Sequence, residues 1–496
     1  VSAVRASAFA APMRQRMSPD LLAGQPFEQL VRVGEDLAEG IVAADEPARA
    51  NDAPDPNWPQ QTLQQAAYLR ALLQRCAAAA ASITSHLEES GVSVHIVFEL
   101  EQVQARIGRI EALLDALLAP APQRVLLNLV CDLVDLSRQR RSLRALLARQ
   151  YSLLARKVAE RHAESGEHYI TRTREEYRSM LRAAAGGGAV IAFTTFAKFF
   201  IVGLGLAPFW AGFGAGMNYA LSFLLIHLLH WTVATKQPAV TAPAMADKLA
   251  NLGDDASVQG FVDEVANLVR SQIAGIVGNL AVVAPVVLAI QLLAWWSVGA
   301  PLVSEKEARY VLHSITLLGP TALFAAFTGV LLFSSSLVAG WVENWFVYHR
   351  LDSAIAHHPG IVARLGASRA AGWSRWWRQN ISGVAANVSL GLLLGLVPAV
   401  LAFMGLPIDV RHVTLSTGQL AAAAGTLGLA VLSEPAFWWC FAALLVTGTL
   451  NLGVSFWLAL RVALRSRGIT VDDRARLHRA IRQRLWQRPR SFLLPD

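Results

Sequence analysis

Cysteine is scarce in this sequence, which contains only Cys76, Cys131 and Cys440 among its 496 residues. The three stand far apart, and this excludes a disulfide framework and a Cys-x-x-Cys metal site. The first third of the chain also lacks a phosphate-binding glycine loop, a metal-ligand cluster and a nucleophile motif. We therefore expect no catalytic residue, no metal site and no cofactor.

Charged residues are scarce as well: they make up 16% of the chain, whereas a soluble domain averages about 25%. The deficit is local, because residues 1–183 have an ordinary charge density and residues 184–465 do not. With 54% hydrophobic residues and a mean hydropathy of +0.38, the composition predicts a soluble domain followed by a membrane domain. We expect no secretory signal in the first residues, because Arg5 and Pro12 interrupt them.

The first 183 residues predict a bundle of amphipathic helices. Apolar positions recur at helical spacing from Leu69 to Leu87, and those from Leu100 to Leu117 alternate strictly between three and four residues. A further helix is predicted from Leu126 to Leu154, and a shorter one at about Phe27–Val42. Short connections between such helices are typical of an antiparallel bundle.

Six later stretches are apolar and long enough to cross a bilayer, which takes about 20 residues. Their expected bounds are 186–206, 210–233, 277–298, 314–339, 382–404 and 437–460. The predicted fold is therefore all-α. It consists of an N-terminal cytoplasmic antiparallel helical bundle (1–183), a six-span α-helical membrane domain (184–465) and a basic amphipathic cytoplasmic tail (466–496).

The distribution of lysine and arginine predicts which side of the membrane each connection faces. One set of connections, together with the tail, contains Lys236, Lys248, Arg270, Arg350, Arg364, Arg369, Arg375 and Arg378. The opposite set contains only Lys306, Arg309 and Arg411. Because basic residues concentrate on the cytoplasmic side, we expect both termini in the cytoplasm and the protein in the bacterial inner membrane.

A candidate intramembrane polar site consists of Lys198, His227, His230 and Glu343. A charge as deep as Lys198 costs a few kcal/mol and is a functional hypothesis by default, and the two histidines share one helix face. Such a cluster would relay a proton, bind a metal or line a transport path. The simpler alternatives are a lysine that extends to the interface and histidines that anchor helices, and two histidines alone are weak evidence for a metal.

Other polar and small residues in the spans have structural interpretations. Five amides are candidates for hydrogen bonds between spans: Asn218, Asn279, Gln291, Asn387 and Asn451. The pairs Gly212/Gly216 and Gly391/Gly395 have the G-x-x-x-G spacing that allows close helix packing. Lys236 and Gln237, in the connection after the second span, mark a candidate cytoplasmic loop.

The tail predicts a basic amphipathic helix. Ile481 and Leu485 lie on one face among five arginines, which are Arg474, Arg476, Arg479, Arg482 and Arg484. A helix of this kind more often lies on anionic lipid headgroups than on nucleic acid, and both remain candidate partners. A protein partner of the N-terminal bundle is a further candidate, and the oligomeric state is left open.

Three long stretches carry a family resemblance: HLEESGVSVHIVFELEQ (His86–Gln102), GEHYITRTREEYRSMLRAAAGGG (Gly166–Gly188) and PFWAGFGAGMNYALSFLLIHLLHWTVATKQPAVTAPAMA (Pro208–Ala246). From about Ser85 onward the chain resembles a transmembrane family described as site-specific recombinases (Gcr-type). Members of that family tend to be longer at the N-terminus, so we expect the start at Val1 to be truncated.

The resemblance implies DNA strand exchange, but the residues of neither recombinase class are present. No tyrosine follows Tyr348, and no histidine is followed three residues later by arginine. A serine recombinase would need an α/β domain where this chain predicts helices. We therefore expect a membrane protein linked to DNA recombination by its family, which acts by binding or scaffolding. The alternative is a transporter or channel that uses the polar residues of the spans.

Overall fold

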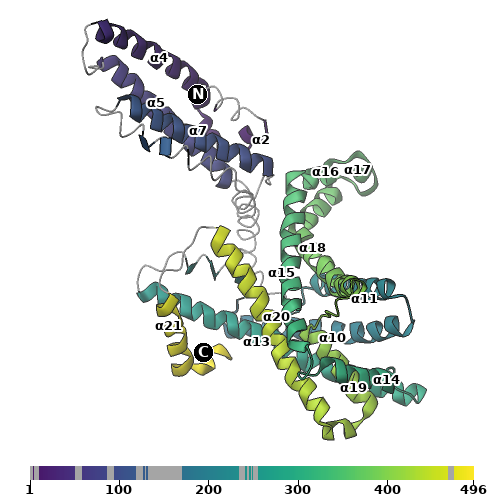
Figure 1. Cartoon of the computed structure of the whole chain (residues 1–496). Coiled ribbons are helices and arrows are strands. Elements are labelled where there is room, and N and C mark those ends of the chain that lie inside the picture. The colour runs from purple at the N-terminus through teal and green to yellow at the C-terminus, as the bar shows by residue number, and fades with distance from the viewer. Residues whose placement is uncertain are drawn as a thin grey trace. The chain divides into compact units, whose positions relative to one another are not determined.

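A computed structural model of the chain (Figure 1) describes residues 4, 11–50, 59–85, 94–118, 127–128, 130–131, 134, 170–233, 241–242, 245–246, 248–249, 255–466 and 474–495. Over these residues the secondary structure is helical, with no strand, so the predicted all-α class is confirmed. The chain divides into two compact units, Val1–Leu154 with Asn344–Ser374, and Ala155–Glu343 with Arg375–Asp496.

The first unit begins with the helices α2 (Ala11–Arg14), α3 (Pro19–Leu22), α4 (Pro26–Ala50), α5 (Gln60–Ser85) and α7 (Val94–Leu118). The apolar stripes predicted for α5 and α7 lie in one shared core, with Leu69, Leu72, Cys76, Ala80, Ile83, Leu100, Val103, Ile107 and Leu114 all buried. Leu117 is the exception, since 52% of its surface is exposed. The helix predicted at 126–154 lies almost entirely outside the described residues.

The second segment of this unit contains the short helices α16 (Leu351–His357) and α17 (Pro359–Leu365). Tyr348, just before them, packs against the core of the N-terminal helices. The guanidinium of Arg16 lies over its ring, 5.5 Å from the centroid, in a cation–π contact. Residues 344–374, which connect two of the predicted spans, thus belong to the same unit as the N-terminal helices.

The second unit is built from six long helices, two of which extend into the first unit: α10 (Arg174–Gly203), α11 (Pro208–Leu228), α13 (Asp255–Val298), α15 (Thr321–Tyr348), α18 (Ala367–Phe403) and α20 (Pro435–Ser466). All six are long and apolar enough to cross a membrane. The chain is therefore a multi-pass membrane protein, as predicted. The fourth span begins at Thr321 rather than 314, because Pro320 separates it from a short helix, α14 (Glu305–Ile315).

Amides hold the spans together at several points. Asn218 of α11 donates to the carbonyl of Thr194 on α10 at 2.9 Å, and Asn279 of α13 donates to the carbonyl of Ala184 on α10 at 2.6 Å. Among the five amides predicted for this role, only Asn387 bonds within its own helix, to Gly383. Hydrogen bonds of this kind contribute about 1 kcal/mol each between helices in a bilayer.

Three consecutive glycines in α10 allow the segment that follows α11 to pass directly against the backbone of α10. A Cβ at Gly186 would lie 2.3 Å from the indole of Trp231, and one at Gly187 would lie 2.2 Å from the carbonyl oxygen of Thr232. The N–H of Thr232 also donates to Ala183 at 3.1 Å. The first two spans, α10 and α11, thus form a helical hairpin in which the segment after α11 packs against α10.

The two G-x-x-x-G motifs pack against each other. A Cβ at Gly391 would lie 2.2 Å from the backbone nitrogen of Ala220, and one at Gly395 would lie 2.3 Å from that of Gly216. A Cβ at Gly212 would in turn lie 2.8 Å from the carbonyl oxygen of Gly395. The backbones of α11 and α18 are therefore in direct contact, which only small residues allow.

A helix that the sequence analysis did not predict, α19 (Val413–Leu427), lies between the fifth and sixth spans. Its 15 residues make a helix about 22 Å long, too short for a hydrocarbon layer of about 30 Å. The connection starts at Phe403, 90% exposed, reaches His412, 2% exposed, and returns to Leu429, 85% exposed. Because α18 and α20 are consecutive spans, the connection between them begins and ends on the same side of the membrane. We therefore interpret α19 as a re-entrant half-helix that begins inside the membrane domain.

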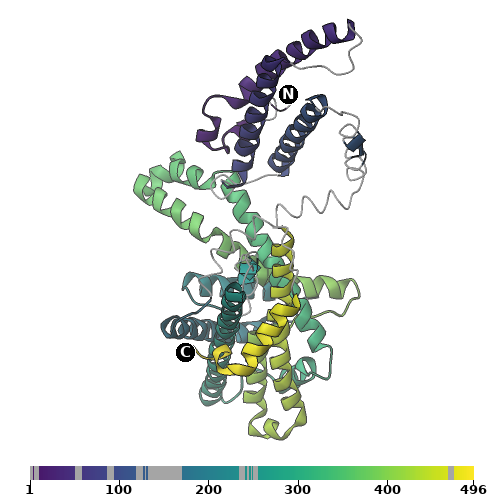
Figure 2. The same ribbon diagram turned by 90° about the vertical axis from the view of Figure 1, so that its left-hand side faces the viewer.

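The C-terminal helix α21 (Arg474–Gln487) packs along the first half of α13 (Figures 1 and 2). Leu477 is buried there with Phe261 and Leu268, and Ile481 packs against the same cluster. Arg484 forms an ion pair with Asp263 of α13 at 3.0 Å. A short 3-10 helix, η3 (Pro489–Phe492), follows, and the carbonyl of Ser491 accepts a hydrogen bond from Arg270 at 3.4 Å.

Candidate functional site

The start of α19 is held by Asn451, a fully buried residue near the middle of α20. Its side-chain oxygen accepts a hydrogen bond of 3.1 Å from the N–H of Val413. Its amino group donates to the carbonyls of Arg411 and Ala325, both at 2.9 Å. Irregular backbone inside a bilayer is tolerated only where the protein satisfies its polar groups or it lines a cavity, and this one amide satisfies three of them.

Arg411 fixes the chain just before α19. It is 8% exposed, and its guanidinium donates to the carbonyls of Val410 and Ser314, both at 2.8 Å, and to the carboxylate of Asp409 at 2.5 Å. The guanidinium also lies 5.4 Å from the ring centroid of Phe324. Arg411 was predicted to lie in a connection between spans, but it is buried because partners from α14 and α15 surround it.

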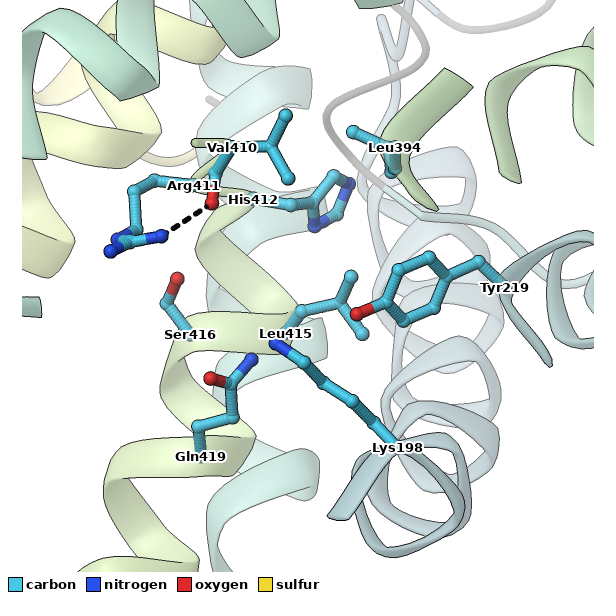
Figure 3. A pocket seen from close by; sticks show the side chains of 9 residues that line it. All are labelled: Lys198, Tyr219, Leu394, Val410, Arg411, His412, Leu415, Ser416 and Gln419. Atoms are coloured by element: carbon cyan, nitrogen blue, oxygen red, sulfur yellow. Dashed lines mark hydrogen bonds between the residues drawn. The ribbon is translucent and has the colours of Figure 1, made fainter. Parts of the chain in front are cut away.

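A small cavity lies beside the first two turns of α19 (Figure 3). Its volume is about 20 Å³ and its lining comes from four helices and the preceding loop, with Lys198, Tyr219, Leu394, Val410, Arg411, His412, Leu415, Ser416 and Gln419. His412, Leu415, Ser416 and Gln419 have the spacing of one helix face. The cavity therefore lies against the N-terminal part of the half-helix, where the helix dipole is positive.

Several side chains point polar groups into this cavity. Figure 3 shows the amine of Lys198 and the hydroxyl of Tyr219 directed into the same space. Tyr219 is 4% exposed and Ser416 is 2% exposed, yet neither hydroxyl forms a hydrogen bond within the described part of the chain. Lys198 likewise has no hydrogen bond or ion pair to a described residue. Buried polar groups almost always have partners, so an unsatisfied set around one cavity is unusual.

The charges at the cavity do not cancel. Lys198 and Arg411 are cationic, and Asp409 is the acidic group beside them. Arg411 forms an ion pair with Asp409 at 2.5 Å, so two basic side chains lie beside one carboxyl group.

Of the two histidines predicted for the polar site, His227 lies in a contact between helices and His230 lies at the end of a helix. The imidazole of His227 packs directly on Gly383 of α18, where a Cβ would lie 2.3 Å from the ring. His230 is exposed and has a positive φ of 56°. Its N–H donates to His227 at 3.0 Å, and the N–H of Trp231 donates to Ile226 at 2.9 Å. This is the pattern that ends a helix with a left-handed residue, a position usually occupied by glycine.

The cavity at α19 is lined by only one of the four predicted intramembrane residues. Lys198 lines the cavity at α19, whereas His227, His230 and Glu343 are not in its lining. Glu343 is buried on α15, with 6% of its surface exposed. Lys236 and Gln237, the candidate cytoplasmic loop, lie outside the described residues. Of the predicted site, only Lys198 is placed in the cavity beside α19.

The tail arginines have different environments. Arg479 and Arg482 are exposed, Arg476 is half-buried, and Arg484 is in the ion pair with Asp263. The backbone of Arg474 begins α21, and its side chain lies outside the described residues. Leu477 and Ile481 pack on α13, so the apolar residues near the start of α21 cover another helix, and the exposed arginines lie on the other face.

Four residues of the cavity lining were not predicted as site residues from the sequence: Tyr219, His412, Ser416 and Gln419. One signal was available, since 413–427 is an apolar stretch of 15 residues followed by Gly428. Apolar segments of 10–14 residues often form re-entrant or buried helices. Recognising that stretch as a helix would have placed Ser416 and Gln419 on one face of it.

A family model described as "Site-specific recombinase" matches residues 1–495 of the chain. No curated protein matches the chain. No solved structure matches it either.

Proposed function

The chain belongs to the site-specific recombinase family, whose model matches residues 1–495. From its architecture we propose that this protein moves a small solute across a membrane. The observation that carries the proposal is the half-helix α19, which begins beside a polar cavity inside the membrane domain. Broken helices whose N-termini face a cavity are how many transporters bind a solute. A purely structural span needs no such element.

The surroundings of α19 support this proposal. Asn451 and Gln291 bond the half-helix to α20 and α13, and Gln291 donates to the carbonyl of Ala422 at 3.1 Å. Close contacts with α10 complete the enclosure, since a Cβ at Gly418 would lie 2.3 Å from the hydroxyl of Thr195. A rigid cradle of this kind positions the polar groups of a binding site.

The family name refers to DNA strand exchange, for which this chain offers no matching chemistry. The described residues form helices without a strand, so the α/β domain of a serine recombinase has no counterpart among them. No tyrosine occurs after Tyr348 to act as a strand-transfer nucleophile. We propose that the connection of this protein to recombination is not catalytic.

We further propose that the protein lies in the bacterial inner membrane with both termini in the cytoplasm. Lysine and arginine concentrate in the connections 234–276 and 346–380 and in the tail, and the opposite connections have few. Arg364 and Arg369 are exposed, which supports a solvent-facing basic side. This is the asymmetry of the positive-inside rule.

The transport proposal is tested by reconstituting the purified full-length chain into liposomes. Currents are recorded on a supported membrane after concentration jumps of protons and of small inorganic and organic ions. We expect a solute-dependent current that protein-free vesicles lack and that Lys198→Met reduces at least tenfold, while Lys306→Met, at an exposed residue of α14, leaves it unchanged. Absence of current for every solute in wild-type vesicles would end the proposal.

A second candidate function is binding to a polyanion through α21, and the exposed Arg479 and Arg482 favour it. Duplex DNA is the probe suggested by the family. Affinity for DNA must fall steeply with salt, because binding releases counterions from the phosphates. Fluorescence anisotropy would measure it for the wild type and for the double variant Arg479→Ala/Arg482→Ala. Binding that is absent, or insensitive to salt and to both substitutions, would remove this candidate.

A further inference from the structure

The cavity beside α19 presents hydrogen-bond donors that have no acceptor. Lys198 offers three N–H donors and no acceptor, and the hydroxyls of Tyr219 and Ser416 can both donate. These three groups line one cavity, and none has a hydrogen bond to the part of the chain that the structure describes. A lysine can only donate, so the group that satisfies this set must accept.

The electrostatic surroundings select an acceptor with negative charge. Arg411 forms an ion pair with the one carboxyl group beside the cavity, Asp409, at 2.5 Å, and Lys198 is a second basic side chain, so basic groups outnumber acidic ones there. Arg411 already has three partners at 2.5–2.8 Å, so Lys198 is the cation available to a ligand. The N-terminus of α19 adds a partial positive charge, and His412 at its N-cap makes no side-chain cap.

The size of the cavity restricts the ligand. Its volume of about 20 Å³ exceeds the ~10–15 Å³ that one water molecule needs. A phosphate ester, an amino acid or a nucleotide has several times the volume of water and does not fit. An ion of about the size of a water molecule does fit.

We propose that this cavity is a binding site for a small monovalent anion of halide size. The ammonium of Lys198 and the hydroxyls of Tyr219 and Ser416 coordinate the ion, and the first turn of α19 stabilises its charge. The inference deepens the proposed function, because it names the class of solute. An anion can bind this site without being transported, so binding and transport are tested separately.

Chloride is the probe. The purified full-length chain in detergent is unfolded thermally in mixtures of chloride and gluconate salts at constant ionic strength, since gluconate is too large for the cavity. A ligand that binds only the folded state raises the unfolding midpoint in proportion to ln(1 + [L]/Kd). We expect the midpoint of the wild type to rise with chloride, and to rise with the logarithm of the chloride concentration once that concentration exceeds Kd.

Three variants identify the site. Lys198→Met keeps the length of the side chain without its charge, and we expect it to require at least tenfold more chloride for the same response. Tyr219→Phe and Ser416→Ala remove one donor each, and we expect threefold to tenfold weaker responses. The matched control Lys306→Met, at an exposed lysine of α14, should respond as the wild type does. If Lys198→Met fails to fold, the two hydroxyl variants still decide the question.

Two outcomes overturn the proposal. Equal midpoints in chloride and gluconate for the wild type would mean that the cavity holds water only. An unchanged chloride response in Tyr219→Phe, Ser416→Ala and any folded Lys198→Met would place the effect elsewhere in the protein. Chloride binding without any current in liposomes would instead retain the site and end the transport proposal. Currents of another solute without a chloride response would retain transport and end the site.

Discussion

The side chain of Asn451 accepts a hydrogen bond of 3.1 Å from the N–H of Val413, the first residue of α19. Asn451 lies near the middle of α20, so this contact fixes the start of the half-helix inside the membrane domain rather than at its surface. The same amide donates to the carbonyl of Arg411 at 2.9 Å. The position of α19, and with it the cavity at Lys198, therefore depends on one polar side chain.

Replacing Asn451 should destabilise the fold. Asn451→Leu keeps the volume but leaves the N–H of Val413 and the carbonyls of Arg411 and Ala325 without partners. We expect a loss of about 2 kcal/mol, since an unsatisfied buried polar group costs about 1–3 kcal/mol. The control is Asn387→Leu, because Asn387 is also buried and its side chain bonds only within its own helix. Thermal unfolding in detergent measures both, and equal midpoints would contradict the role given to Asn451.

The direct contact between α11 and α18 predicts a strong effect of size at Gly391. Gly391→Val forces the two backbones apart, because even a Cβ there would lie 2.2 Å from Ala220. We expect loss of the folded protein or a large fall in its unfolding midpoint. Gly453→Val on α20 is the control, since no atom lies within 4 Å of a Cβ at that position. Size-exclusion chromatography after extraction compares them, and a well-folded Gly391→Val would show that the packing is wrong.

The left-handed backbone at His230 predicts that glycine is tolerated there. His230→Gly removes the steric cost of a side chain at φ 56°, which is about 1–2 kcal/mol for an ordinary residue. We expect an unfolding midpoint at or above that of the wild type and unchanged currents in liposomes. If currents disappeared in a folded His230→Gly variant, His230 would belong to the functional site, and its interpretation as a helix-ending residue would be incomplete.

The packing of α21 on α13 predicts that one leucine controls its attachment. Leu477→Asp places a charge in the cluster with Phe261 and Leu268 and removes a buried side chain worth about 1.5–3 kcal/mol. We expect α21 to detach and trypsin to cleave after its arginines at least tenfold faster. Leu485→Asp, at a residue 49% exposed, should leave the cleavage rate unchanged. Equal rates in Leu477→Asp and the wild type would exclude this packing.

Local patterns in the sequence were sufficient to predict the six spans and the glycines that allow close packing. Apolar length alone identifies α10 and α11, and the spacing of Gly391 and Gly395 identifies a surface for close packing. The partner of that surface depends on the fold, because Gly212 and Gly216 lie far from it in sequence. The periodicity of α7 likewise identified its buried face, apart from Leu117 at the end of the helix.

The half-helix and its site were not predictable in the same way. The stretch 413–427 contains Ser416 and Gln419 and is too short to span, so hydropathy left it in a connection. Arg411 becomes buried through Ser314, Asp409 and Phe324, and two of these partners are distant in sequence. Lys198 stood out because it is a charge in an apolar run, whereas the hydroxyl of Tyr219 gains significance only from the cavity that it faces.

The central claim, that α19 enters and leaves the membrane domain on one side, is tested most directly by cysteine labelling. Cys76, Cys131 and Cys440 are first replaced by alanine, and Met404→Cys and Leu429→Cys are then introduced singly. Both positions are exposed, at 66% and 85%. In sealed vesicles of known orientation, a membrane-impermeant maleimide should label both residues from the same side. Labelling from opposite sides would mean that 413–427 crosses the membrane, and it would contradict the half-helix and the function proposed from it.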